Sequence, residues 1–393
     1  MPLLATEARA LAMSGMEALR AGDARLARET FEQITTSAHA DAFSFVGLAY
    51  SCRNMRDQAA TLAAVDRALA LEPRNLRALL LKADYLAESG DARAASSFYA
   101  FAIRSAPSAS QLPADLRDDL ARAQTMCQRY AGEFEAALRD KLDRLGSVES
   151  GASTRFRQSL DILLGKKQVY FQRPQTYFFP ELPQIQFYER GDFPWADKVE
   201  AATAEIRQEL LEVLKDPSAF RPYIQGDPKR PHKEQEGLQD NPDWGAFYLW
   251  KDGEIVRENV ARCPRTASVM ADVPLSRVTG RSPSVLFSLL RPGAHIPPHS
   301  GMLNTRLICH LPLIVPPGCD FRVGNEVRTP VEGKVWLFDD TIEHEAWNRS
   351  DKTRVILLFE VWRPELSEQE RSLVSSMFQA IDAYGGTKPG SGI

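Results

Sequence analysis

The segment His299-Ser-Gly-Met-Leu-Asn304-Thr-Arg306-Leu-Ile-Cys-His310-Leu-Pro-Leu-Ile-Val315 joins a short polar turn to a long apolar run. Residues 306–315 are rich in β-branched and apolar side chains, which is typical of a buried β-strand. Comparable runs occupy residues 284–291, 334–338 and 354–362, and Pro and Gly residues separate them. Several short strands divided in this way predict a β-sandwich or β-barrel.

The residues before these strands predict flanking elements of a second core. An aromatic-rich stretch begins at Tyr170, and residues 196–214 have the apolar spacing of an amphipathic helix. Residues 246–256 contain an Asp-Gly pair between two short apolar runs, which predicts a β-hairpin. The polar, proline-containing segment 217–242 is too long for a simple turn, so we expect a functional loop there.

The first third of the chain repeats itself with a period of 34 residues. Shifting the sequence against itself by this period aligns small residues, bulky residues and closing prolines in columns. These columns include Gly15 with Ala49 and Ala83, Gly22 with Arg56 and Gly90, Phe31 with Val65 and Tyr99, and Pro73 with Pro107. The pattern resembles the tetratricopeptide repeat, in which paired helices stack into a solenoid. An irregular helical bundle is the alternative.

These patterns predict an α+β protein with two domains. Residues 1–145 are expected to form the tetratricopeptide-like helical domain, whose open end is capped by a helix over residues 116–145. Residues 146–169 are expected to be a linker and connecting helix, because residues 146–153 are small and polar. Residues 170–393 are expected to form the β-domain with flanking helices.

Composition excludes several classes of protein. The 393 residues include 48 basic and 52 acidic side chains, so the formal charge of −4 does not favour electrostatic binding of nucleic acid. The five cysteines are scattered without CxxC spacing, which argues against a disulfide framework or a structural zinc site and favours the reducing cytoplasm. Because no apolar run approaches the roughly 20 residues of a membrane span, we expect a protein that is neither exported nor membrane-spanning.

Histidines concentrate in the predicted β-domain. Four of the six in the chain are His295, His299, His310 and His344. Two neutral imidazoles brought together from separate strands suit a divalent transition metal such as Fe(II). Arg354 follows His344 by ten residues, and a hairpin between them would place its guanidinium near the metal, where it could bind an anionic cosubstrate in bidentate fashion.

The spaced residues of this region resemble the aspartyl/asparaginyl β-hydroxylase family. The resemblance rests on the quoted segment 299–310, on Gly333-Lys-Val-Trp-Leu-Phe-Asp-Asp340, on His344-Glu345 and on Arg354. It implies an Fe(II)- and 2-oxoglutarate-dependent oxygenase on a double-stranded β-helix, or jelly-roll, core. Members of the family have glycine two residues after the first metal-binding histidine, and Gly301 stands at that position.

The resemblance also implies roles for individual residues. His299 and His344 would be the only protein ligands of iron. Arg354 would bind the distal carboxylate of 2-oxoglutarate, with Ser288 and His310 assisting the cosubstrate. Water and 2-oxoglutarate would fill the remaining metal positions until O2 enters.

The substrate is less closely defined by the resemblance. Arg306 matches an arginine that faces the substrate carboxylate in peptide hydroxylases, but the family arginine two residues further on is Ile308 here. We expect hydroxylation at the β-carbon of Asp or Asn in a peptide or protein that the helical domain presents. Hydroxylation of a small amino acid or lipid, a non-catalytic tetratricopeptide adaptor, and a cupin-like isomerase or zinc hydrolase are the alternatives.

Several polar neighbours are expected to be structural. Alternation along a strand points Glu345 away from the metal and points Cys309 into the core on the face opposite His310. Asp339 and Asp340 are expected to form a turn rather than a catalytic pair of carboxylates.

Overall fold

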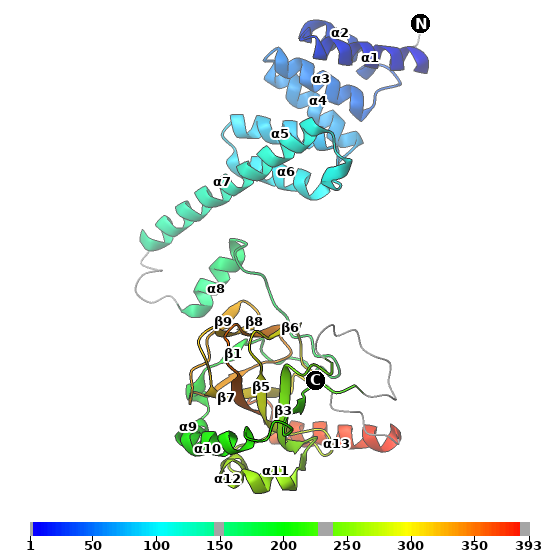
Figure 1. Ribbon diagram of the computed structural model, residues 1–393. Coiled ribbons are helices and arrows are strands. Elements are labelled where there is room, and N and C mark those ends of the chain that lie inside the picture. Colours follow the sequence, from blue (N-terminus) through cyan, green and yellow to red (C-terminus); the bar gives the residue numbers. More distant parts are fainter. Residues whose placement is uncertain (1–2, 145–152, 227–238, 386–393) are drawn as a thin grey trace. The chain divides into compact units, whose positions relative to one another are not determined.

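The computed structural model describes residues 3–144, 153–226 and 239–385 and divides the chain into two compact units (Figure 1). Residues 1–164 form the first unit and residues 165–393 the second. The division falls inside the predicted connecting segment 146–169. The small polar residues predicted to be its linker lie, apart from Ser153, outside the described residues.

The first unit consists of helices, as predicted. Three successive helical hairpins are followed by a long helix and a shorter one (Figure 1). The hairpins are α1 (Ala5–Arg20) with α2 (Ala24–Thr35), α3 (Ala42–Asn54) with α4 (Gln58–Leu71), and α5 (Leu76–Glu88) with α6 (Ala92–Ser105); η1 (Ala109–Gln111), α7 (Ala114–Arg144) and α8 (Thr154–Leu163) follow. Helix α7 packs on α5 and α6, so the expected capping helix is present.

The tight turn inside each hairpin repeats in chemical detail. The residue before the second helix is Asp23, Asp57 or Asp91, and each carboxylate accepts a hydrogen bond from the backbone N–H three residues later. This N-cap satisfies a donor that the helix itself leaves unpaired. In the first repeat, a Cβ on Gly15 would lie 2.8 Å from the ring of Phe31, which explains the small residue in that column.

In each repeat the residue before the capping aspartate has a left-handed backbone conformation. In the second repeat this residue is not glycine, so the conformation is strained there. Gly22, Arg56 and Gly90 have φ angles of 79°, 61° and 84°, a left-handed conformation that suits glycine. Arg56 is exposed and forms no ion pair with any residue that the structure describes. Arg56→Gly is therefore expected to raise the free energy of unfolding by about 0.5–1 kcal/mol, as measured by urea denaturation of the full chain.

The equivalent glycine of the third repeat provides the matched control for this prediction. Gly90→Arg is expected to lower the free energy of unfolding by a similar amount, because it places a side chain in the same left-handed conformation. An Arg56→Gly chain that is less stable than its parent would contradict the assignment of this column.

The second unit is built from two antiparallel sheets. The large sheet has the order β1 (Phe187–Tyr188), β10 (Trp336–Phe338), β7 (Arg306–Ile314), β12 (Arg354–Trp362), β5 (Val285–Leu290), β3 (Trp244–Lys251), β2 (Arg221–Pro222), and β4 (Glu254–Ile255) pairs with β3. The small sheet has the order β6 (His295–His299), β11 (His344–Asn348), β8 (Cys319–Val323), β9 (Glu326–Arg328). From β5 to β12 the chain passes back and forth between the two sheets, apart from the β8–β9 pair within the small sheet. This arrangement confirms the predicted jelly roll.

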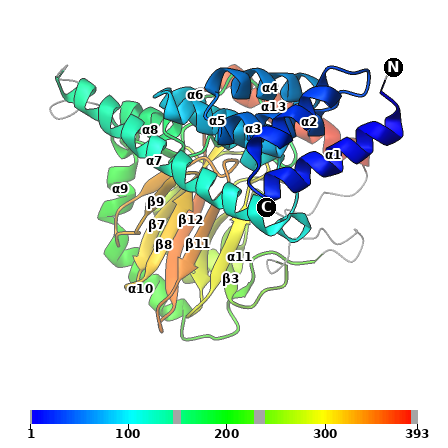
Figure 2. The ribbon, with the colours of Figure 1, turned by 90° about the horizontal axis from the view of Figure 1, so that it is seen from above.

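The core of this unit has two layers, one on each face of the large sheet. Apolar side chains of the small sheet, such as Phe321 and Val323, pack against Ile308, Phe338 and Ile356 on the inner face of the large sheet. The outer face is covered by helices that Figure 2 shows beside the strands. The flanking helices are α9 (Ala196–Ala201), α10 (Thr203–Val213), α11 (Arg257–Arg262), α12 (Pro264–Ala271) and α13 (Glu368–Gly385), with η2 (Arg190–Asp192) before α9.

The predicted elements of this unit are present with some differences. The strands of the large sheet and the hairpin at 246–256 lie where the sequence places them. The single helix predicted over 196–214 is divided at Ala202 into α9 and α10. Residues 227–238 of the predicted functional loop 217–242 lie outside the described residues. Among the helices that the structure describes, none combines the length and apolar character needed to cross a bilayer.

Candidate functional site

A pocket between the two sheets collects five of the six candidate site residues that the sequence analysis selected. Ser288, His299, His310, His344 and Arg354 all line it. The histidines at 299 and 344 come from the small sheet, and the other three residues come from the large sheet. The jelly roll thus brings together five side chains that come from five different strands.

The two predicted metal ligands face each other across neighbouring strands. His299 pairs with His344 in the β6–β11 register, and their ring centroids are 4.1 Å apart. Ile296 pairs with Ala346, so β6 contains one more residue than β11 between the two pairs. Because side chains alternate along a strand, this β-bulge at Pro297-Pro298 is what lets both Ile296 and His299 face the pocket.

Backbone contacts orient both imidazole rings. Nδ1 of His299 donates to the carbonyl of Pro297 at 2.8 Å, and Nδ1 of His344 donates to the carbonyl of Ile342 at 3.1 Å. In the neutral rings these bonds leave each Nε2 without a proton, so that its lone pair can bind a metal ion. Burial lowers the pKa of His299, and burial with the neighbouring His299 lowers the pKa of His344 well below its ordinary value. Neutral imidazole is the form that binds a metal ion.

A carboxylate fills the space beside Gly301. A Cβ at this glycine would lie 1.9 Å from Oδ2 of Asp340 and 2.3 Å from its Cγ. The Gly301 N–H also donates to the Asp340 carbonyl at 2.7 Å. Burial raises the pKa of Asp340 to about 7, although Arg306 opposes this shift. Neither carboxylate oxygen accepts a hydrogen bond from a described residue, so a buried acceptor remains unsatisfied beside the histidines.

The predicted turn contains both aspartates, because the Ile342 N–H donates to the Asp339 carbonyl at 3.2 Å and Asp340 lies between them. Asp339 accepts hydrogen bonds from the backbone and hydroxyl of Thr341, as a turn residue does. The side chain of Asp340 also lines the pocket, which the turn prediction does not include. Adjacent residues in an extended chain point to opposite sides, so one of two neighbouring carboxylates can serve the turn while the other faces the site.

The large sheet supplies the second group of polar side chains. Ser288 lies opposite Ile356, and His310 lies opposite Leu358, on the two sides of β12. Residues 354, 356 and 358 share one face of β12, so Arg354 and these two polar residues all point inward. Nδ1 of His310 is buried and has no hydrogen-bond partner among the described residues.

Arg354 is a buried cation without a counterion. Only 3% of its surface is exposed, and it forms no ion pair with any described residue. Burial lowers its pKa to about 10, so it still carries its charge at neutral pH. A buried unpaired guanidinium is unfavourable unless an anion binds to it, and its planar donors match a carboxylate.

The route by which Arg354 reaches the pocket differs from the prediction. A hairpin between His344 and Arg354 was expected, but β11 belongs to the small sheet and β12 to the large sheet. The connection crosses from one sheet to the other. Arg354 therefore faces the histidines from the opposite wall of the pocket.

Arg306 occupies a different environment from the other predicted residues. Its Nη1 lies 2.7 Å from Oε1 of Glu360, and its Nη2 lies 3.5 Å from Oδ2 of Asp340. It is not among the described residues that line the pocket. A contact between Arg306 and substrate stays a prediction.

The predictions for Glu345 and Cys309 are confirmed. Glu345 points away from the pocket, where its carboxylate accepts from Arg322 and lies 3.0 Å from Nε2 of His295. Cys309 belongs to the core on the outer face of the large sheet, opposite His310.

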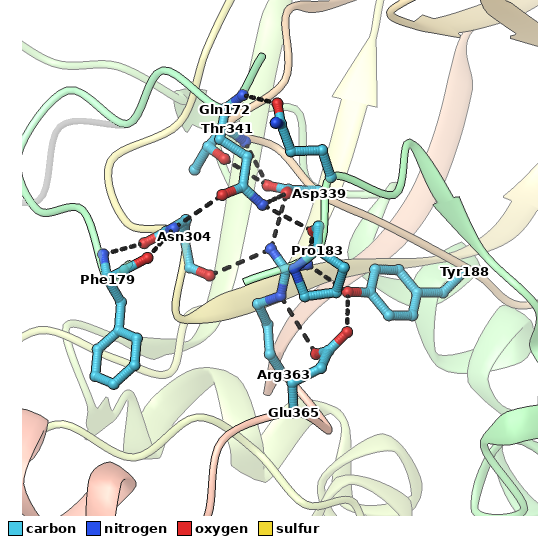
Figure 3. Close-up of polar contacts among 10 residues, drawn as sticks. Gln172, Phe179, Pro183, Tyr188, Asn304, Asp339, Thr341, Arg363 and Glu365 are labelled. Atoms are coloured by element: carbon cyan, nitrogen blue, oxygen red, sulfur yellow. Dashed lines mark hydrogen bonds and ion pairs between the residues drawn. The ribbon is translucent and has the colours of Figure 1, made fainter. Parts of the chain in front are cut away.

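Sequence reasoning missed a buried ion pair beneath the site (Figure 3). Arg363 and Asp339 are both fully buried, and Nη1 of the arginine donates to Oδ2 of Asp339 at 2.8 Å. Gln172 donates to the same oxygen at 2.6 Å. Nothing in the periodicity of the sequence marks Arg363, which follows β12 directly.

This ion pair holds both loops that border the histidines. Asp339 begins the segment that leads to His344. Arg363 also donates through its side chain to the carbonyl of Asn304 at 3.4 Å and through its backbone to the carbonyl of Thr305 at 3.2 Å. The segment after His299 and the segment before His344 are therefore attached to one buried charge pair.

Comparison with known proteins identifies relatives of the second unit. Residues 200–364 match the sequence profile of the aspartyl/asparaginyl β-hydroxylase family. The mouse aspartyl/asparaginyl β-hydroxylase is 41% identical over 140 residues, which is 35% of this chain and 19% of that protein. The ornithine lipid ester-linked acyl 2-hydroxylase of Rhizobium tropici is 36% identical over 191 residues, or 47% and 63% of the two chains. The chain thus spans less than two thirds of the length of either relative.

The helical unit resembles solved structures at low identity. PcrH of Pseudomonas aeruginosa is 22% identical with a TM-score of 0.29, and the match covers 33% of this chain and 94% of that one. The first TPR domain of human RPAP3 is 12% identical with a TM-score of 0.27, and the match covers 32% and 97%.

Proposed function

Because the second unit contains an aspartyl/asparaginyl β-hydroxylase family domain over residues 200–364, we propose that this protein is a hydroxylase that uses Fe(II), 2-oxoglutarate and O2. The observation that carries the proposal is one pocket with two kinds of binding group. His299 and His344 present free Nε2 atoms, and Arg354 is a buried cation without a counterion. An imidazole pair suits the metal, and the guanidinium suits a dicarboxylate cosubstrate.

The residues present fit an iron site of few protein ligands. His299 and His344 would hold the ion, and the unsatisfied carboxylate of Asp340 lies beside Gly301 to accept hydrogen bonds from water there. When bound, iron with 2-oxoglutarate and O2 supplies the oxidant for an unactivated C–H bond, and 2-oxoglutarate becomes succinate and CO2.

The protein side chains bind and orient the reactants. Arg354 would bind the distal carboxylate of 2-oxoglutarate through two charge-assisted hydrogen bonds. The Ser288 hydroxyl, which already accepts from Nε1 of Trp244 at 3.2 Å, and the unpaired Nδ1 of His310 would complete this anion site. The apolar walls formed by the inner faces of both sheets would exclude water from the reaction.

Two substrate classes follow from the relatives. Hydroxylation at the β-carbon of Asp or Asn in a peptide is supported by the similarity to the mouse aspartyl/asparaginyl β-hydroxylase, and the repeated helical hairpins would present such a peptide. Hydroxylation of an acyl chain is supported by the similarity to the ornithine lipid ester-linked acyl 2-hydroxylase of Rhizobium tropici. The five cysteines are free, which agrees with action in a reducing compartment.

Anaerobic titration of the Fe(II)-loaded full chain with 2-oxoglutarate tests this proposal. We expect a visible charge-transfer band from the chelated keto acid, and we expect His299→Ala to abolish it because one of only two protein ligands is lost. His295→Ala is the matched control, since His295 lies on the same strand but stacks on Trp347 outside the pocket.

Either result of the titration is informative. A band that His295→Ala retains and His299→Ala loses supports the site. No band in the parent protein, together with no succinate formation in air, would favour a non-catalytic adaptor instead.

A further inference from the structure

Every second residue of β7 lies on the inner face of the large sheet, where β10 and β12 flank β7 on its two sides. Arg306, Ile308 and His310 lie two residues apart and therefore share the inner face. Ile308 pairs with Glu360 of β12 and lines the pocket. An apolar side chain thus stands between the buried arginine and the histidine of the cosubstrate site.

The charge of Arg306 is already used inside the protein. Only 6% of Arg306 and 1% of Glu360 are exposed, and the two side chains form an ion pair at 2.7 Å. Moving the guanidinium toward a substrate carboxylate would leave Glu360 buried without a counterion. Arg306 is therefore unsuited to act as a receptor for an anionic substrate.

The remaining charges of the pocket also disfavour an anion near the metal. Among the described residues that line it, the only cation other than histidine is Arg354, which the proposed function assigns to 2-oxoglutarate. The only carboxylate among these lining residues is Asp340, whose Oδ2 lies 3.5 Å from Nη2 of Arg306. A substrate carboxylate entering here would find no free cation among these lining residues to pair with it.

The rest of the lining favours apolar contact. The inward side chains of both sheets form a continuous hydrocarbon surface around the histidines: Ile296, Ile308, Phe321, Phe338, Ala346 and Leu358. Transfer of an aliphatic group from water to such a surface is favourable without any charged anchor.

We propose that the substrate group presented to His299 and His344 is an uncharged aliphatic chain, and that Ile308 is the residue that selects it. The inference rests on the proposed hydroxylase function and narrows its substrate. An acyl chain of a lipid and an aliphatic side chain of a peptide share this chemistry. The aspartyl side chain does not.

The test compares matched probes with the full Fe(II)-loaded chain and 2-oxoglutarate. The probes are a decanoyl ester with a neutral head group, a Leu-containing peptide, and the same peptide with Asp or Asn in place of Leu. We expect gain of one oxygen atom, with succinate formation, on the decanoyl ester or the Leu peptide at least about tenfold faster at low substrate concentration than on the Asp or Asn peptide.

Variants at position 308 test the selecting residue. Ile308→Ala, which keeps the pocket apolar, is expected to weaken binding of the preferred aliphatic probe by about tenfold, as measured by titration calorimetry. Ile308→Arg is expected to abolish that binding and to improve binding of the Asp peptide. Val327→Arg adds the same charge on the exposed strand β9 and should change neither.

The outcomes separate this inference from the function on which it rests. A charge-transfer band with faster turnover of the Asp or Asn peptide, or with no turnover of either aliphatic probe, overturns the inference and leaves the hydroxylase proposal standing. Loss of the band itself overturns the hydroxylase proposal.

Discussion

Arg354→Ala is expected to weaken 2-oxoglutarate binding by about 30- to 1,000-fold, because the variant loses a buried charge-assisted contact. The effect should be large because the other basic residues among the described lining of the pocket are histidines, which burial keeps neutral. Anaerobic titration of the Fe(II)-loaded protein measures it directly. Arg354→Lys should recover only part of the affinity, since an ammonium group cannot make the bidentate contact.

The same substitution should act in the opposite direction on stability. In the free protein Arg354 is a buried charge without a counterion, so Arg354→Ala is expected to leave the melting temperature unchanged or to raise it. Saturating 2-oxoglutarate should raise the melting temperature of the parent protein but not of the variant.

A surface arginine supplies the control for both measurements. Arg349 is half exposed and pairs with Asp320 outside the pocket, so Arg349→Ala should change neither the affinity nor the response to 2-oxoglutarate. Equal affinity of the parent and the Arg354→Ala variant for 2-oxoglutarate would contradict the assignment of the anion site.

The sequence predicts best those elements that are buried on both faces. Strands β5, β7 and β12 lie between two apolar layers, so they are continuous hydrophobic runs that stand out from their surroundings. The helical repeats are equally visible, because each hairpin uses the same small contact residues and the same capping aspartates.

The small sheet could not be predicted in the same way. Strand β6 is only His295–His299, it contains two prolines, and its bulge breaks the alternation on which strand prediction depends. Strand β9 has three residues and no fully buried side chain. Its neighbour β8 alternates in burial but lies next to a turn on each side.

The site residues likewise fall into two groups: those that the sequence pattern predicts and those whose contacts depend on the folded chain. His299, His344 and Arg354 are recognisable because their spacing matches a family pattern. The position of Asp340 depends on the missing side chain of Gly301, which is a relation between two loops rather than a local pattern. The distant partners of Arg363 come from positions 183, 188, 304 and 339, which only the folded chain brings together.

Arg363→Met is expected to lower the free energy of unfolding by about 3–5 kcal/mol, because it leaves Asp339 buried and uncompensated. The lost donors also include those to Pro183 and Tyr188, so the segment before β1 should loosen with it. Urea denaturation measures the change. Adding Asp339→Leu should recover part of the stability, because the double variant removes the stranded charge.

The Arg363–Asp339 pair also positions the segments that carry the metal ligands. Arg363→Met is therefore expected to have a second effect, which a loss of stability alone would not cause. The ion pair holds the segments around Gly301 and Asp340, so the folded Arg363→Met variant is expected to bind metal about 10- to 100-fold more weakly than the parent. Arg281→Met is the matched control, since Arg281 pairs with Asp382 of α13 away from the pocket. Both variants should be less stable than the parent, but only Arg363→Met should lose metal affinity. Equal metal affinity of the two variants would show that the Arg363–Asp339 pair contributes to stability alone.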